Sequence, residues 1–278
     1  MVGVLVVAEA ALAGSPELWV REFAAVAGQP TGVMGELAAE VRAPVLRYGG
    51  VAFNGTFVGA GARLAVTPVH AEGALRLSAQ PIDLLPVTVE VFRGQYWESP
   101  WGFVPATSVG HQRTRDRAPY YEADRDFAAT VWGASVSPTL QARLGPIAGF
   151  TNPTWTWLSV SPSPDPEPWM FEPYRGLVIA DHDRLFEHTS ALLWELADGE
   201  DAPIVRFGPI LRGKASHATG DRTLNLGGVL QWRPGRQAHD ATLMLLVAPY
   251  LEDPDFVGPV PMVAAVVTIE QWFALGPR

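Results

Sequence analysis

The sequence predicts an all-β fold: a closed antiparallel up-and-down β-barrel that crosses a membrane on about twelve strands, within a range of roughly 10–14. Three observations lead to this prediction. Apolar and polar residues alternate over stretches about as long as one tilted membrane strand. The composition is 48% hydrophobic, yet no run approaches the roughly 18 consecutive apolar residues of a membrane helix. Short polar turns and one long polar insertion, residues 98–123, separate the alternating stretches.

The clearest alternation lies in a hairpin that spans residues 203–234. In its first arm Val205 and Phe207 share one face, whereas Arg206 and Arg212 share the other. The second arm alternates in the same way. A period of two residues is typical of a strand whose two faces meet unlike environments.

The rest of the chain repeats this unit. Residues 69–80 alternate throughout, with His70, Glu72 and Arg76 on one face. The pattern predicts further strands at residues 56–66, 87–91, 127–136, 140–150, 154–160, 171–179, 188–196, 240–250 and 261–272. Residues 161–168 are rich in proline, which cannot donate to a sheet ladder, so they are expected to form a connection.

The two ends of the chain are expected to lie outside the barrel. Residues 1–13 resemble a truncated secretory signal peptide, because an apolar run precedes a small-x-small sequence. Residues 14–50 could form short helices near residues 16–23 and 34–41, but their helical periodicity is poor. They are interpreted only as a mobile or plugging segment of uncertain structure. The predicted barrel domain covers residues 51–273, and residues 274–278 form a short tail.

Composition excludes several classes of function. The formal net charge of −9 disfavours a nucleic-acid partner, since phosphate binding requires clustered Lys and Arg. The chain has no Cys, so it can form neither a disulfide nor a thiolate metal site. No Gly-rich phosphate loop is present. The sequence therefore predicts no cofactor and no metal.

Alternation alone does not say which face of the sheet points outward. A soluble barrel buries its apolar face, whereas a membrane barrel turns that face to lipid. The polar face here mixes single charges with Gly, Ser and Thr, which is typical of a crowded lumen. The alternative is a soluble all-β domain that binds a ligand or carbohydrate on stacked Trp side chains. That alternative requires a closed core that contains Leu75, Leu77, Leu144, Leu224 and Leu226.

Residues 56–273 resemble a bacterial outer-membrane β-barrel in style. The phrases that carry the resemblance are RLAVTPVHAEGALRLSAQPIDLL, SPTLQARLGPIAG and FGPILRGKASHATGDRTLNLGGVLQWRPG. The strand 267–273 also resembles the assembly signal of such barrels, although five residues follow Phe273. The resemblance implies a location in the outer membrane of a Gram-negative bacterium, with membrane lipid as a partner, and it implies no substrate.

One cluster could carry catalysis. Asp181, His182 and Asp183 stand together, and His188 follows. Such residues can bind a metal or transfer protons, but a polar loop between two strands explains them as well. The sequence therefore predicts no catalytic residue and no enzyme. An outer-membrane hydrolase that uses the region of His182 and His188 remains a third hypothesis.

Charged residues on the polar face are the candidate functional residues. Inside a barrel such groups either pair and plug the lumen or line a path for solutes. We expect a narrow, passive, porin-like channel for small polar or anionic solutes, or a structural envelope protein. The residues predicted to line the lumen are Arg63, Glu72, Arg76, Glu90, Arg143, Glu195, Arg206, Arg212, Lys214 and Glu270. If the cations among them remained unpaired, the pore would prefer anions.

Overall fold

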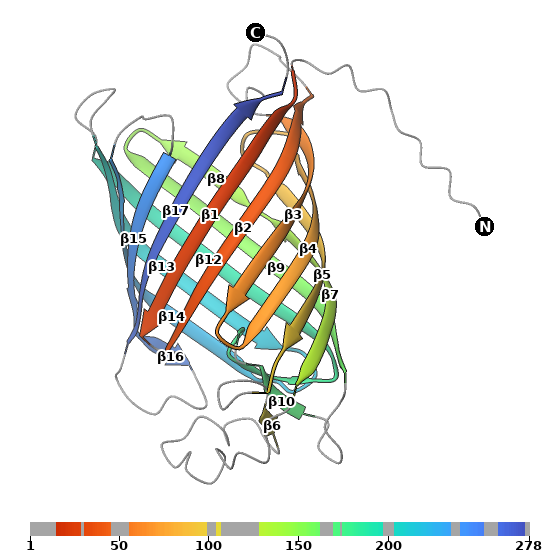
Figure 1. The fold of residues 1–278 in the computed structure, drawn as a ribbon. Helices are drawn as coiled ribbons and strands as arrows, with labels where there is room; N and C mark the ends of the chain where they lie inside the picture. The colour runs from red at the N-terminus through yellow and green to blue at the C-terminus, as the bar shows by residue number, and fades with distance from the viewer. Residues whose placement is uncertain are drawn as a thin grey trace.

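A computed structural model describes residues 15–28, 31–45, 56–98, 104–106, 128–161, 169–172, 174–196, 203–234, 240–252 and 261–275. Within this part of the chain, no helix is long and apolar enough to cross a membrane. The main sheet is a closed barrel, drawn in Figure 1. Its strands are β1 (Glu17–Gly28), β2 (Thr31–Pro44), β3 (Phe57–Thr67), β4 (His70–Gln80), β5 (Val87–Tyr96), β7 (Ala129–Pro138), β9 (Ile147–Ser161), β12 (His182–Leu196), β13 (Ile204–Ser216), β14 (Arg222–Arg233), β15 (Asp240–Ala248) and β17 (Met262–Ala274).

Every neighbouring pair around the barrel is antiparallel, and the circle closes where β1 pairs with both β2 and β17. Two short strands extend the wall: β8 (Leu140–Leu144) pairs with β9, and β16 (Tyr250–Glu252) pairs with β14. The prediction of a closed antiparallel barrel with about twelve strands is confirmed.

The interpretation of residues 14–50 as a mobile or plugging segment is corrected, because β1 and β2 occupy most of this segment. The barrel therefore begins at Glu17 and not at residue 51. The reason is visible in β1, where Trp19 and Phe23 lie on the inward face, so apolar residues occur on both faces of the strand. The alternation of polar and apolar residues along β1 is therefore weak, and the strand is recognised from its pairing with β17 and β2. Residues 1–13 lie outside the described residues.

A second correction concerns the strand predicted at residues 171–179. These residues belong to a separate three-stranded sheet made of β6 (Val104–Ala106), β10 (Trp169–Glu172) and β11 (Leu177–Ala180). This small sheet lies at one end of the barrel (Figure 1). We call that end the loop end, because the long connections after β5, β9 and β15 start there. The opposite end, where β1 starts and β17 finishes, is the turn end.

The outward face of the barrel is apolar. Leu75, Leu77 and Leu144 are 73%, 62% and 83% exposed. These are side chains that a soluble domain would have to bury, so the soluble alternative is wrong. Aromatic side chains point outward near both ends. Those toward the loop end are Trp132, Trp155, Trp157 and Phe186, and those toward the turn end are Trp194, Phe207, Trp232 and Phe273. Two aromatic girdles around an apolar band are the exterior of a barrel in lipid.

Candidate functional site

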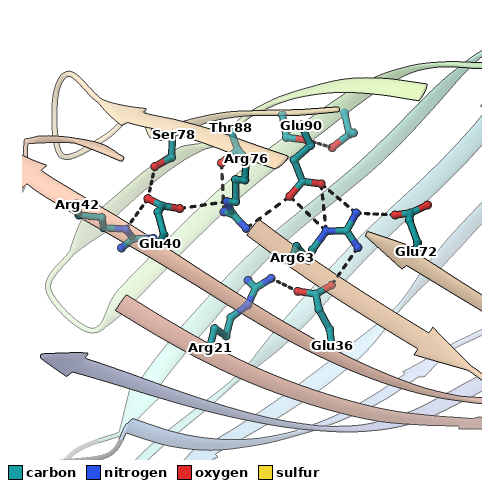
Figure 2. A network of polar contacts seen from close by, with 12 residues as sticks. Arg21, Glu36, Glu40, Arg42, Arg63, Glu72, Arg76, Ser78, Thr88 and Glu90 are labelled. Atoms are coloured by element: carbon teal, nitrogen blue, oxygen red, sulfur yellow. Dashed lines mark hydrogen bonds and ion pairs between the residues drawn. The ribbon is translucent and has the colours of Figure 1, made fainter. Parts of the chain in front are cut away.

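The wall formed by β1 to β5 carries a continuous network of ion pairs on its inward face (Figure 2). Arg63, on β3, lies at its centre. Its guanidinium donates to Glu72 Oε1 at 2.6 Å and to Glu90 Oε2 at 3.2 Å, and its Nη1 lies 3.7 Å from Glu36 Oε2. The four side chains come from four adjacent strands and are mostly buried. One cation therefore contacts three carboxylates in the lumen.

Glu40, on β2, is the second centre of this network and is fully buried. Its Oε1 accepts from Arg42 Nε at 2.8 Å and from the Ser78 hydroxyl. Its Oε2 lies 3.3 Å from Arg76 Nε, and Arg76 reaches Glu90 at 3.7 Å. The two centres are therefore joined through Arg76 and Glu90.

The side chain of Glu40 extends across β3 to β4, because the residue of β3 between them is a glycine. Gly61, on β3, lies opposite Glu40 on one side and opposite Arg76 on the other. A Cβ at Gly61 would collide with the backbone oxygen of Ala39 and with Glu40 Cα, so glycine permits this close approach. The same space requirement explains why glycine stands in the middle of a strand, where it normally weakens the sheet.

Gly61→Ala is expected to destabilise the barrel by about 1–3 kcal/mol, because backbone atoms must shift to admit the methyl group. Gly73→Ala provides the matched control, since nothing lies within 4 Å of its Cβ position. Urea unfolding in detergent micelles measures both changes. Equal stability of the two variants would contradict the tight contact between β2 and β3.

Strands β10 and β11, with the turn 174–176 between them, fill the mouth of the barrel at the loop end. We call residues 169–172 and 174–180 the cap. Met170, Leu177 and Ile179 of the cap are fully buried in one cluster with wall residues that include Phe92 and Val131. Gly176 has a φ of +67°, a conformation that favours glycine, and it closes the turn. The cap is therefore packed into the barrel as a core is packed.

Arg175 ties the cap to the wall electrostatically. Its guanidinium lies 3.5 Å from Glu72 Oε2 and 3.7 Å from Glu172 Oε2. Burial by itself would lower the pKa of Arg175, but the carboxylates of Glu172 and Glu72 raise it above its ordinary value, so the side chain stays charged. Its backbone oxygen accepts from Lys214 Nζ at 2.8 Å. Arg175 thereby connects the cap to β4 and to β13.

Polar and aromatic contacts hold the rest of the cap. Glu172 accepts hydrogen bonds from the Tyr96 hydroxyl and from the backbone N–H groups of residues 174 and 175. The imidazole of His70, on the wall, stacks on the Tyr96 ring with 4.1 Å between ring centroids, and its centroid lies 5.0 Å from that of the Tyr174 ring. Burial raises the pKa of Tyr174 to about 12. The hydroxyl therefore stays neutral at physiological pH.

The opposite wall pairs its charges locally. Glu195 accepts from Arg143 at 2.7 Å and from Arg206 at 2.8 Å. Lys214 lies 3.4 Å from Glu187. Two of the predicted lumen cations on β13, Arg206 and Lys214, therefore have carboxylate partners.

The structure places the remaining candidates individually. Arg212 donates to the sulfur of Met262 at 3.6 Å, and its side chain is half-buried. Glu270, on β17, stands opposite Arg21 of β1 in the ladder. Of the ten candidates, the structure joins Arg63, Glu72, Arg76 and Glu90 in one network and Arg143, Glu195 and Arg206 in another.

Several members of these networks were missed by the sequence reasoning. Glu36, Glu40 and Arg42 lie in β2, inside the segment interpreted as mobile or plugging. Their spacing of two and four residues is strand-like and was the available signal. Glu172 and Arg175 gave no such signal, because their partners depend on the cap entering the barrel.

The cluster at residues 181–183 does not converge with His188. Asp183 is buried and accepts hydrogen bonds from the Ser216 hydroxyl at 2.6 Å and from the Ala218 N–H at 3.0 Å, so it braces the neighbouring turn. His182 is exposed, and its ladder partner Ser159 lies far from Pro153, the partner of His188. Among the described residues, no group of three or more His, Asp or Glu side chains could hold a metal ion.

Comparisons with known proteins match the fold and not a sequence family. No family model and no curated protein matches the chain. Similar solved structures include the β domain of the Bordetella autotransporter BrkA, with 11% identity, TM-score 0.47, and coverage of 94% of this chain and 100% of that one. An outer membrane channel from Pseudomonas putida F1 has 10% identity, TM-score 0.38, and coverage of 94% and 96%. LpxR from Salmonella typhimurium has 9% identity, TM-score 0.38, and coverage of 92% and 99%.

Structural similarity at such low sequence identity says nothing about the activity of this protein. The closed barrel, its apolar exterior and its aromatic girdles are what confirm the predicted bacterial outer-membrane β-barrel and its outer-membrane location. The prediction that the chain is not an enzyme is corrected. A barrel can catalyse a reaction without a motif that is recognisable in its sequence, so the absence of such a motif is no argument against catalysis.

Proposed function

We propose that this protein is a capped outer-membrane barrel that works in the cell envelope without an open pore. The observation that carries the proposal is the cap. Met170, Leu177 and Ile179 are fully buried among side chains of the barrel wall. A segment packed in this way obstructs the loop-end mouth, and Arg175 holds it to the carboxylate of Glu72 on the wall.

The paired lumen charges support the same proposal. An anion-selective pore needs fixed positive charge that is not neutralised. Arg63, Arg76 and Arg206 each face at least one carboxylate within 4 Å. Ion pairs of this kind cross-link the strands. They favour the structural envelope role over the narrow channel.

Planar-bilayer recording tests the proposal. The purified barrel is expected to give no sustained conductance. Replacing residues 169–180 by a Gly-Ser linker of equal length should open the loop-end mouth and give stable conductance steps. Gel mobility before and after boiling checks that both proteins are folded. Stable anion-selective current from the unmodified protein would overturn the capped barrel in favour of the channel.

A further inference from the structure

A groove opens on the outer wall of the barrel toward the loop end. Its basic side chains are Arg184 of β12, Arg222 of β14 and His217 in the turn between β13 and β14. The rings of Trp155 and Phe186 line its apolar side, with 5.7 Å between ring centroids. The groove therefore places basic groups beside aromatic rings of the loop-end girdle.

The floor of the groove is low because β13 carries small residues there. Ala215 lines the groove and stands opposite Phe186 on one side and opposite Arg222 on the other. Gly213 lies two residues further from the loop end on the same face of β13, opposite Leu224 of β14. Larger side chains therefore flank a strip about 7 Å long that carries only a methyl group and a hydrogen atom. Such a strip can take the first carbons of an acyl chain.

Hydrogen bonds hold the turn that carries His217. Its backbone N–H donates to the backbone oxygen of Arg184 at 2.9 Å. The Thr219 hydroxyl donates to the backbone oxygen of Val178 at 2.7 Å, and the Asp221 carboxylate accepts from the Val178 N–H at 2.6 Å. The turn is thereby fixed to β12 and to β11 of the cap. A rim that is ordered before binding lowers the entropic cost of holding a ligand.

Exposed arginines of the outer wall gather at this end of the barrel. Arg93, Arg184 and Arg222 are exposed on the outer face, each within three residues of the loop-end terminus of its strand. Toward the turn end, Arg143 is exposed too, but it forms an ion pair with Glu195 at 2.7 Å. Outer-membrane barrels have short periplasmic turns and longer extracellular loops, so the loop end faces the outside of the cell. Because girdles mark the membrane–water interface, the groove lies at the head groups of the outward leaflet.

We propose that this groove binds an anionic lipid of the outward leaflet that carries a phosphate monoester above its acyl chains. Arg184 and Arg222 lie on strands two apart, so strand spacing places their Cα atoms roughly 12 Å from each other. Both side chains can then reach a phosphate above Ala215. A phosphate monoester carries roughly 1.5–2 negative charges and three acceptor oxygens, which two guanidinium groups match. The acyl chain lies along β13 beside Phe186. The site is on the outer wall and does not depend on the cap.

Native mass spectrometry of the full-length barrel, released from detergent micelles after lipid is added, tests this proposal. The probes are lipid A, which carries phosphate monoesters, phosphatidylglycerol, which carries a phosphodiester, and zwitterionic phosphatidylcholine. Lipid A is expected to bind most tightly. Arg184→Gln together with Arg222→Gln should weaken its binding about 30-fold, since each arginine near a membrane surface contributes about fivefold. Arg93→Gln removes an arginine from the same end of the barrel but outside the groove, and should leave binding unchanged.

A second pair of variants tests the shape of the groove separately from its charge. Ala215→Leu fills the floor and should weaken the binding of lipid A about tenfold, the loss expected when two methylene groups lose their contacts. Ala60→Leu, at an exposed position on the outer face of β3, is the matched control. Gel mobility before and after boiling checks that each variant is folded.

Three results would overturn the proposal. The first is phosphatidylcholine or phosphatidylglycerol bound as tightly as lipid A. The second is binding of lipid A that stays unchanged in the double arginine variant or in Ala215→Leu. The third is an unmodified protein that binds no lipid A.

Discussion

Arg63→Met is expected to lower the free energy of unfolding by about 3 kcal/mol, because it removes the nearest cation from the buried carboxylates of Glu72 and Glu90. Within the described residues, these carboxylates then keep the longer contacts to Arg175 at 3.5 Å and to Arg76 at 3.7 Å. Arg63 forms ion pairs with Glu36, Glu72 and Glu90, whose side chains are 11%, 1% and 14% exposed. Their mutual repulsion adds to the cost of burial. Urea unfolding of the barrel in detergent micelles, followed by tryptophan fluorescence, measures the change.

Arg143→Gln is the control for the effect of Arg63. Arg143 also forms an ion pair with a lumen carboxylate, at 2.7 Å from Glu195, but its own side chain is 59% exposed. Glu195 also keeps Arg206. A loss of about 1 kcal/mol or less is expected, as for exposed pairs. If both variants lost the same amount, the network around Arg63 would not be a special contributor to stability.

Arg175→Met is expected to release the cap from the barrel while leaving the wall intact. In the unmodified protein, Arg175 Cζ lies 5.2 Å from the ring centroid of Phe92 and 5.3 Å from that of Tyr174. The substitution keeps a long apolar side chain beside both rings. Within the described residues, it removes the cation that forms an ion pair with Glu172, at 3.7 Å. A penalty of about 3 kcal/mol for an unpaired buried carboxylate would make opening of the cap roughly 150-fold more frequent.

Hydrogen exchange at the amides of residues 174–180 measures this opening. Arg93→Met is the matched control, because Arg93 is exposed and stacks on Trp132 at 4.8 Å. The control should leave exchange in the cap unchanged. Exchange in Arg175→Met that remained as slow as in the unmodified protein would show that apolar packing alone holds the cap. Conductance that appeared with faster exchange would link opening of the cap to opening of the pore.

The faces of the barrel strands could be predicted from the sequence wherever the two faces differ in polarity. In β4, His70, Glu72 and Arg76 point inward while Leu75 and Leu77 point to lipid, as alternation indicates. The same method failed in β1, whose inward residues Trp19 and Phe23 are apolar. It also failed for β10 and β11, because Met170, Leu177, Val178 and Ile179 are all buried and show no alternation.

The sequence by itself determined the class of fold, the approximate number of strands and the face on which Arg63 and Glu72 lie. These properties follow from a period of two residues along one strand, which is local information. Only the tertiary structure decided which carboxylate meets which cation, that the cap enters the mouth, and that Arg184 and Arg222 share one groove. Each of these depends on the register between strands far apart in sequence, and a shift of one residue would turn the side chains of a strand to the other face.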